Sequence, residues 1–259
     1  MIQIMNYDIG QFDTSTLSEL ERSIFNKKQR SPVIYRYTSP DSLRFELKMR
    51  SNIVAAAKEL KDSRAAFATF KNSRGNEQFW VRTAKGGLQQ RPDVLSSAAI
   101  RDIFKNGRLY GFECATAMIV VWYKATLDTI GEENFNTHFN NLLLYDWQYD
   151  SDLRIRIVQN INEAYPGDVV YFENPDFNPK TPQWRGENAI MLTDDLYFGH
   201  GIGIKNASDM ITSLNRRRKP NSTTPAFLSE QVDQLDFEHL HQLSRSLTAR
   251  IGSRIYKLV

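Results

Sequence analysis

The sequence holds one cysteine, four histidines and little excess charge, and each shortage excludes a class of protein. Because Cys114 is alone, no disulfide can form within the chain, so folding does not depend on an oxidising compartment. One cysteine and scattered histidines cannot form a closed zinc site, so we expect no metal and no other cofactor. The net charge of +3 arises from 33 basic and 30 acidic residues, a balance that gives no argument for a nucleic-acid partner.

Long apolar runs are missing as well. No stretch approaches the roughly 18 apolar residues that a membrane span requires, so we expect no membrane partner. The first residues lack the basic and apolar regions of a secretory signal, and we expect none. With 41% hydrophobic and 24% charged residues, the composition is typical of a globular protein. Without repeats or low-complexity linkers, we expect one α+β domain over residues 1–259, with about 1–35 and 236–259 peripheral.

The apolar pattern predicts two principal helices. Ser39 and Pro40 form a helix start, and apolar residues then recur every three or four positions over about 20 residues. A second helix opens at Cys114, runs to about Ile130 and is apolar on nearly every side, which is typical of a helix buried at a domain centre. Shorter helices are expected at 98–105, 132–144, 208–217 and 235–247, and one capped by 13–15 is expected to end near 25.

Strands rich in β-branched and aromatic residues follow the central helix. They are expected at 169–172, 188–192 and 196–204, whereas 218–232 is polar and expected to be a loop. Upstream, residues 66–70 and 78–83 flank a polar turn and are expected to form a hairpin. The fold class is therefore α+β, with the Cys114 helix packed on an antiparallel sheet.

Cys114 is a candidate nucleophile because of its position. In the first turn of a helix, free N–H groups and the positive end of the dipole favour a thiolate. Glu113 can cap the same helix, but its charge would raise the cysteine pKa and oppose activation. The alternative is that Cys114 is a small buried hydrophobic residue without a catalytic part.

A nucleophilic thiol needs a base or an orienting group from elsewhere in the chain. His200 lies between Gly199 and Gly201, so neighbouring side chains cannot shield it; it is either such a group or a turn residue bonded to the main chain. Glu187 begins a strand after a glycine and is either partnered or a solvated strand-edge carboxylate. We assign the other histidines, His138, His239 and His241, to the surface.

Taken together, several segments resemble the transglutaminases of Bacillus spore coats, and the resemblance covers about residues 35 to 235. The strings that carry it are Phe45-Glu-Leu-Lys, Phe112-Glu-Cys-Ala-Thr-Ala, Leu127-Asp-Thr-Ile-Gly-Glu, Leu144-Tyr-Asp-Trp, Gln183-Trp-Arg-Gly-Glu-Asn and His200-Gly-Ile-Gly-Ile. A string as long as that beginning at Gln183 is far more specific than a short catalytic motif.

The resemblance implies a protein-glutamine γ-glutamyltransferase on a papain-like, NlpC-type core. It assigns the nucleophile to Cys114, its partner to Glu187, a further site residue to His200 and an alternative partner to Glu113. The thioester of such an enzyme must be kept from water. Aromatic candidates for a substrate tunnel over the thiol are Trp147, Trp184, Phe67 and Tyr171, whose alternative role is core packing.

The resemblance also implies a calcium-independent monomer that crosslinks spore-coat proteins through ε-(γ-glutamyl)lysine bonds and releases ammonia. Such a protein would be made in the mother cell cytoplasm and retained on the spore surface. Two alternatives remain, a cell-wall cysteine peptidase or amidase of the NlpC type and a non-catalytic coat protein. The peptidases carry a histidine where this chain has Glu187, which counts against the first.

Overall fold

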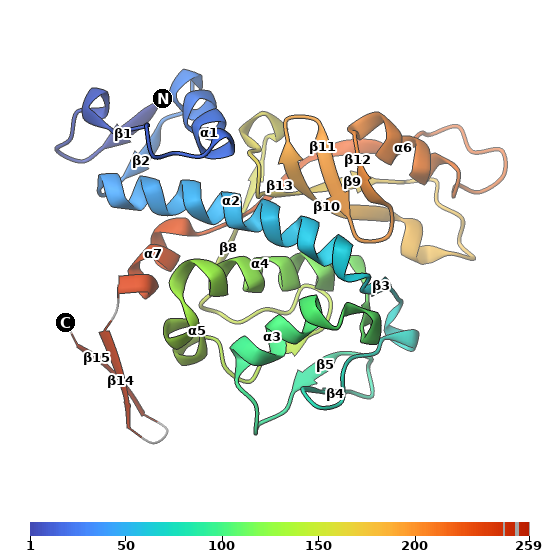
Figure 1. Ribbon diagram of the computed structural model, residues 1–259. Coiled ribbons are helices and arrows are strands. Elements are labelled where there is room, and N and C mark those ends of the chain that lie inside the picture. Colours follow the sequence, from blue (N-terminus) through green and yellow to red (C-terminus); the bar gives the residue numbers. More distant parts are fainter. Residues whose placement is uncertain (246, 252–253, 259) are drawn as a thin grey trace.

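A six-stranded antiparallel sheet forms one layer of the protein, and two long helices lie across one of its faces (Figure 1). The computed structural model describes residues 1–245, 247–251 and 254–258. Helix α6 covers the opposite face of the sheet (Figure 1). In spatial order the strands are β12 (Gly203–Lys205), β11 (Leu196–Gly199), β10 (Gly186–Thr193), β9 (Val169–Glu173), β13 (Phe227–Leu235) and β8 (Ile155–Gln159).

Both principal helices are confirmed. Helix α2 (Pro40–Ser63) begins where Ser39 accepts a hydrogen bond from the Ser42 main chain, with proline at the first helical position. Helix α4 (Cys114–Ile130) is buried along nearly its whole length, as its apolar sequence predicted. Side chains of α2, α4 and the sheet form one hydrophobic core, so α4 packs directly against β10.

Shorter helices surround this core, and some limits differ from the sequence prediction. The first helix is capped by Ser18 rather than by residues 13–15, and the helix expected at 132–144 ends at His138. These elements are α1 (Glu19–Arg30), α3 (Ser96–Lys105), α5 (Glu132–His138), α6 (Ala207–Asn215), α7 (Phe237–Arg245) and the 3₁₀ turns η1 (Ile9–Gln11), η2 (Phe70–Asn72), η3 (Gly107–Leu109), η4 (Ile161–Glu163) and η5 (Pro182–Trp184).

The hairpin expected from 66–70 and 78–83 is wrong. The first of these segments pairs in parallel with the residues just before Cys114, far away in sequence, and the second forms its hairpin with the following strand instead. The turn of that hairpin lies at Gly86, whose φ of +89° favours glycine. The strands outside the main sheet are β1 (Ile2–Ile4), β2 (Tyr35–Tyr37), β3 (Ala66–Phe67), β4 (Trp80–Arg82), β5 (Leu88–Gln90), β6 (Gly111–Phe112), β7 (Leu143–Leu144), β14 (Leu247–Ile251) and β15 (Arg254–Leu258).

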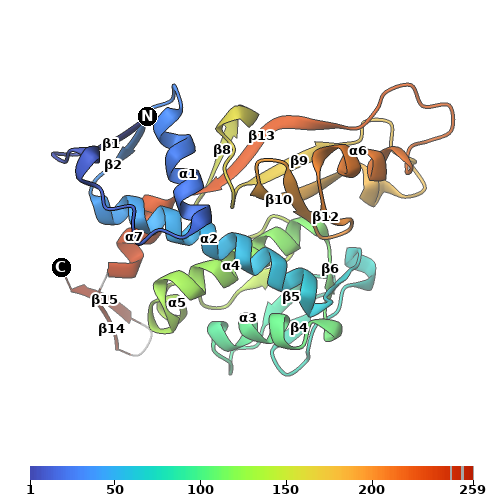
Figure 2. The same ribbon diagram turned by 45° about the horizontal axis from the view of Figure 1, so that its top comes forward.

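Two strands of the main sheet were not predicted. Strand β8 was not assigned, and most of β13 lies in the segment expected to be a loop. Five consecutive residues of β13, from Ser229 to Asp233, include only one apolar side chain, the buried Val232. The register with β9 also shifts between Leu228 and Val232 (Figure 2 shows the long course of β13). The sequence of β13 therefore lacks the alternation of apolar and polar side chains by which a strand is recognised.

A buried network of charges fixes α1 to the rest of the protein. The Lys28 ammonium lies 2.9 Å from the Glu46 carboxylate, which also accepts a hydrogen bond of 2.6 Å from Arg50. Arg50 reaches on to Asp168, just before β9, at 2.8 Å. All four side chains are buried and have lost their contact with water. The ion pairs must therefore offset the cost of removing these charges from solvent.

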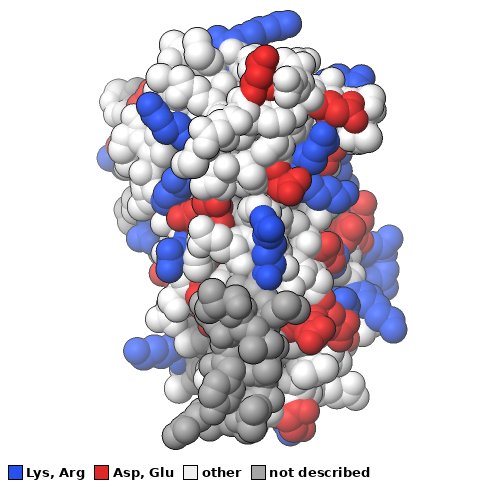
Figure 3. Space-filling view, turned by 90° about the vertical axis from the view of Figure 1, so that its left-hand side faces the viewer, with Lys and Arg blue, Asp and Glu red and all other residues white. Residues whose placement is uncertain are grey.

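The surface carries mixed charge. On the face shown in Figure 3, basic and acidic side chains are interspersed, in keeping with the small net charge. Among the described residues, no helix has the length and apolar character needed to cross a membrane.

Candidate active site

Cys114 is the first residue of α4, and the strand β6 brings the chain into that position (Figure 2). Glu113 is the N-cap, and its Oε2 accepts a hydrogen bond of 3.1 Å from the Ala115 N–H. The same oxygen lies 3.4 Å from the Cys114 Sγ and accepts the thiol proton in a hydrogen bond. The capping carboxylate is therefore also the carboxylate that contacts the nucleophile.

Asn188 contacts the thiol from the sheet. Strand β10 places Asn188 and Ile190 on the face that packs against α4, since alternate residues of a strand share a face. The Asn188 Nδ2 donates a hydrogen bond of 3.5 Å to the Cys114 Sγ. From the sequence, Asn188 was the last residue of the string beginning at Gln183 and had no predicted role. The available signal was its position, one residue after Glu187 and on the opposite face of the predicted strand.

The helix terminus favours a thiolate at Cys114, but burial acts in the opposite direction. Burial raises the pKa of Cys114 well above its ordinary value, and the nearby Glu187 and Glu113 carboxyl groups raise it further. Hydrogen bonds from the main chain and side chain of Asn188 act in the opposite direction. The thiol is therefore protonated at neutral pH, and its reaction requires a proton acceptor.

Glu187 is buried, so the solvated strand-edge alternative is wrong. The residue is only 1% exposed, and its Oε1 accepts a hydrogen bond of 2.9 Å from the Gly201 N–H. Burial raises the pKa of Glu187 to about 8. Gly199 leaves the room for this carboxyl group, because a Cβ there would lie 2.7 Å from Oε1. At neutral pH, Glu187 is accordingly a neutral acid that can donate a proton.

His200 faces main-chain groups. Its Nε2 lies 3.1 Å from the Ala66 carbonyl oxygen, and its ring stacks on Phe112 with centroids 5.0 Å apart. Burial lowers the pKa of His200 to about 4, against the effect of main-chain hydrogen bonds at Ala66 and Phe112. The neutral ring therefore donates from Nε2 to a carbonyl group and anchors the strand pair that leads into Cys114.

The other histidines are not surface residues, contrary to the sequence assignment. His138 and His241 are each 8% exposed, and the side chain of His239 is 11% exposed. They belong to α5 and α7, whose polar sequences suggested solvent contact, but both helices pack against the core.

A cavity of about 330 Å³ opens beside the thiol. Two of the four predicted tunnel aromatics, Trp147 and Tyr171, line it together with Cys114. The Tyr171 ring lies over Gly186, where a Cβ would come 2.1 Å from the phenol oxygen. The polar lining, none of it assigned a role from the sequence apart from Glu113, consists of Glu113, Asp146, Gln183, Arg185, Asn188 and Gln231.

The other two aromatics lie on the side of Glu187. Trp184 and Phe67 stack with ring centroids 5.6 Å apart, and the Arg217 guanidinium lies 3.8 Å from the centroid of Trp184. The Trp184 ring also approaches Gly201, whose N–H holds the Glu187 carboxyl group. The four aromatics thus form two groups, one in the cavity with the thiol and one covering the buried carboxyl.

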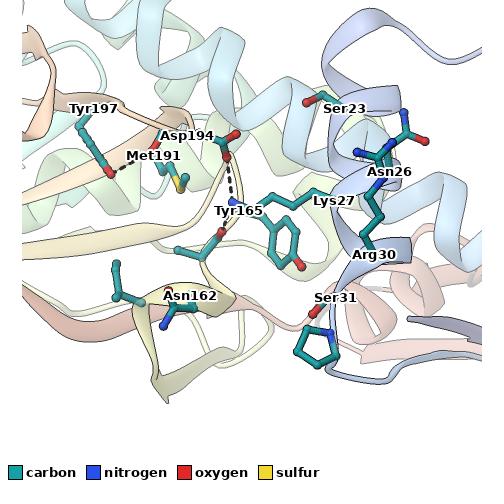
Figure 4. Close-up of a pocket in the computed structure, with 13 residues that line it drawn as sticks. Ser23, Asn26, Lys27, Arg30, Ser31, Asn162, Tyr165, Met191, Asp194 and Tyr197 are labelled. Atoms are coloured by element: carbon teal, nitrogen blue, oxygen red, sulfur yellow. Dashed lines mark hydrogen bonds and ion pairs between the residues drawn. The ribbon is translucent and has the colours of Figure 1, made fainter.

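A wider cavity of about 750 Å³ lies between α1 and the turn that joins β10 to β11 (Figure 4). Lys27 of α1 bridges it by an ion pair of 2.8 Å with Asp194. None of the site residues predicted from the sequence lines this cavity, and it contains no thiol. The candidate active site is therefore the smaller cavity at Cys114. Among the described residues, no group of three or more histidine, cysteine or acidic side chains is arranged to hold a metal ion.

Comparison with known proteins shows the family of the chain. A family model described as protein-glutamine gamma-glutamyltransferase matches residues 1–244. The chain belongs to the protein-glutamine gamma-glutamyltransferase family. A relative from Bacillus cereus is 47% identical over 215 residues, which cover 83% of this chain and 78% of the relative. One from Bacillus licheniformis is 43% identical over 248 residues, covering 95% of this chain and all of the relative.

A solved structure shows the same fold. The transglutaminase from Geobacillus stearothermophilus, without its C-terminal extension, is 52% identical and superposes with a TM-score of 0.75. The match covers 79% of this chain and 97% of that chain. The predictions of a γ-glutamyltransferase and of an α+β cysteine-enzyme core, with the Cys114 helix on an antiparallel sheet, are confirmed.

Proposed function

We propose that this γ-glutamyltransferase works through a thioester on Cys114. The thiolate attacks the side-chain amide of a protein glutamine, a carbon–sulfur bond forms, and ammonia leaves. A lysine ε-amine then attacks the thioester, which releases the thiol and forms an ε-(γ-glutamyl)lysine crosslink. The observation that carries this proposal is the hydrogen bond between the thiol and a carboxylate at the wall of a cavity, since it joins nucleophile and proton acceptor.

The two carboxyl groups divide the proton transfers in this proposal. Glu113 takes the thiol proton, because it already accepts that proton in a hydrogen bond. Glu187 does not line the cavity, but its carboxyl group is close enough to raise the thiol pKa. With its own pKa near 8 it is neutral at pH 7, and in this proposal it donates a proton to the departing ammonia. Two carboxyl groups in different environments can hold acid and base roles at the same pH. His200 supports the entry to α4 through its contact with Ala66 and takes no proton.

The aromatic residues of the cavity limit the entry of water. Trp147 and Tyr171 wall the space where the thioester would form, and both present large apolar surfaces. Exclusion of water protects a thioester from hydrolysis, which would otherwise convert the glutamine to glutamate. Trp184 and Phe67 would act at one remove, by keeping Glu187 dry and its pKa high.

The first experiment measures incorporation of a fluorescent primary amine into a glutamine-rich protein by the wild type and by Cys114→Ala. The proposal requires incorporation by the wild type and none by the variant. A wild type that hydrolyses peptide or amide bonds without joining the amine would support a peptidase. A wild type without either activity would support a non-catalytic coat protein.

A second experiment separates Glu113 from Glu187. Each glutamine variant is expected to lose about 10²- to 10⁴-fold in turnover of the amide substrate, the usual contribution of a general acid or base. With an activated ester, whose leaving group needs no proton, Glu187→Gln is expected to recover and Glu113→Gln to remain slow. Equal recovery of both variants would contradict the division of roles.

The biological setting is proposed from the resemblance to the spore-coat enzymes. We place the protein on the spore surface, after synthesis in the mother cell cytoplasm, as a monomer that crosslinks coat proteins without calcium. Retention of full activity in excess chelator tests the calcium claim. Deleting the gene and measuring isopeptide bonds in purified spore coats tests the setting, which is overturned if the coats of the deletion strain contain as many isopeptide bonds as those of the parent.

A further inference from the structure

The main chain of Asn188 faces a gap in the sheet. The Met191 N–H bonds to Asp168, and the Arg185 oxygen accepts from Asn174, so the odd-numbered residues of β10 bond towards β9. The N–H of Asn188 therefore points to the other side, where β11 would continue. Strand β11 ends at Gly199, opposite Ala189, and the chain turns away. The N–H of Asn188 is left outside the ladder.

The side chain of Asn188 points toward the thiol of Cys114. It lies on the face of the sheet that carries α4, and its Nδ2 donates to the Cys114 Sγ at 3.5 Å. The main-chain N–H of Asn188, which the ladder leaves free to face the sulfur, also lowers the pKa of Cys114 and so favours the thiolate. Asn188 is 9% exposed, so its contact with the sulfur is screened little by solvent. One residue thus brings two donors to the nucleophile.

The reaction needs donors here. Attack on an amide or a thioester carbonyl places negative charge on the carbonyl oxygen, and preorganised N–H groups stabilise that charge. The Cys114 N–H, as the first of α4, belongs to the N–H groups that have no acceptor within the helix. A carbonyl carbon bonded to the Cys114 Sγ would hold its oxygen beside both the helix terminus and Asn188.

We infer that Asn188 is a catalytic residue that stabilises the thiolate of Cys114 and then, through Nδ2, the oxyanion of both tetrahedral intermediates. The inference rests on the proposed function. In the first intermediate the sulfur–carbon bond forms and the carbonyl electron pair moves to oxygen; collapse restores the carbonyl and expels ammonia, which has received a proton from Glu187. In the second, the amine adds and loses a proton to the Glu187 carboxylate, and collapse expels the sulfur, which recovers its proton from Glu113. Asn188 exchanges no proton in either half.

The test compares Asn188→Leu with a matched control, Asn52→Leu. The Asn52 amide also makes a side-chain hydrogen bond, to Thr129, but it lies on α2 without contact to the thiol. Asn188→Leu is expected to lower turnover in amine incorporation about 10²- to 10³-fold, the usual cost of one oxyanion donor. The Michaelis constant for the glutamine substrate is expected to change little, and Asn52→Leu is expected to keep wild-type turnover.

Alkylation separates the two roles of Asn188. Because the chain has a single cysteine, the rate of its reaction with iodoacetamide reports the Cys114 thiolate alone, without any oxyanion. In Asn188→Leu the pH profile of alkylation is expected to move to higher pH, while turnover falls by a larger factor than alkylation does. Equal losses would overturn the oxyanion role, and unchanged turnover would overturn the whole inference.

A second variant keeps the role of Asn188 testable. If Asn188→Leu does not fold, Asn188→Ala, which removes the amide without adding bulk beside α4, gives the same comparison. An inactive wild type would refute the proposed function itself, whereas an active wild type with an unaffected Asn188→Ala would refute only the role of Asn188.

Discussion

Replacing Glu187 by glutamine is expected to stabilise the protein above about pH 5 while impairing its reaction. The carboxyl group is buried, and its pKa is about 8 in the folded protein against an ordinary value of 4.5. Between these two values the unfolded chain releases the proton and the folded protein keeps it, so stability falls as the pH rises through that window. Glutamine carries no charge and can still accept the hydrogen bond from Gly201.

The size of the effect follows from that interval. At about 1.4 kcal/mol per pH unit, the interval from 4.5 to about 8 corresponds to about 5 kcal/mol at pH 8 and above, and to about 3 kcal/mol at pH 7. For a chain of 259 residues, the gain at pH 7 would raise Tm by roughly 6–12 °C. Well below pH 4.5 the gain is expected to vanish, because Glu187 is then protonated in both the folded protein and the unfolded chain.

The assay is urea unfolding of wild type and Glu187→Gln at pH 5, 7 and 9, with the difference in unfolding free energy taken at each pH. Glu173→Gln, on the neighbouring strand β9, controls for removal of a carboxylate from the same sheet. A difference that stays constant with pH, or a variant less stable than wild type at pH 9, would refute the reasoning. Confirmation would mean that the site holds a buried acid at the expense of stability.

Three other substitutions test neighbouring features. Gly199→Ala is expected to reduce turnover at least 10-fold and to lower Tm, because the added Cβ would lie 2.7 Å from the Glu187 oxygen; wild-type turnover would contradict this. His200→Gln keeps a hydrogen-bond donor for the Ala66 carbonyl group, and the His200 pKa is near 4. We therefore expect the pH–rate profile between pH 6 and 9 to be unchanged. Loss of the acidic or basic limb of that profile would show that the imidazole titrates in the reaction. Lys28→Met leaves Glu46 with one cation fewer and is expected to cost about 3–5 kcal/mol in urea unfolding, and an unchanged midpoint would refute the importance of the pair.

The sequence predicted the elements whose signals are local. The start of helix α2 is marked by Ser39 and Pro40, and the burial of α4 is indicated by side chains that are apolar on nearly every side. Elements that depend on distant partners could not be predicted in this way. Strand β3 pairs with β6 across more than forty intervening residues, and no local pattern distinguishes that pairing from a hairpin with the next strand. Strand β13 lacked a regular alternation because of its register shift.

In the candidate site, too, the sequence predicted local features but not those that depend on packing between distant elements. The sequence placed Cys114 at a helix N-terminus and marked Glu113, Glu187 and His200, but the protonation of these groups depends on burial. Burial raises the pKa of the thiol and of Glu187 and lowers that of His200, and it results from packing between separate elements. Asn188 is the clearest residue that the sequence could not identify. Its proposed role depends on the gap that is left beside β10 where β11 ends, and only the sheet topology creates that gap.

The buried charges of Lys28, Glu46, Arg50 and Asp168 also bear on how the chain folds. They come from α1, α2 and the turn before β9, so these distant segments must arrive before all four charges are paired. A partly assembled chain with α1 undocked would leave Glu46 short of a cation and would admit water to the network. The N-terminal helix therefore completes the core, and we expect it to unfold together with the sheet in one cooperative transition.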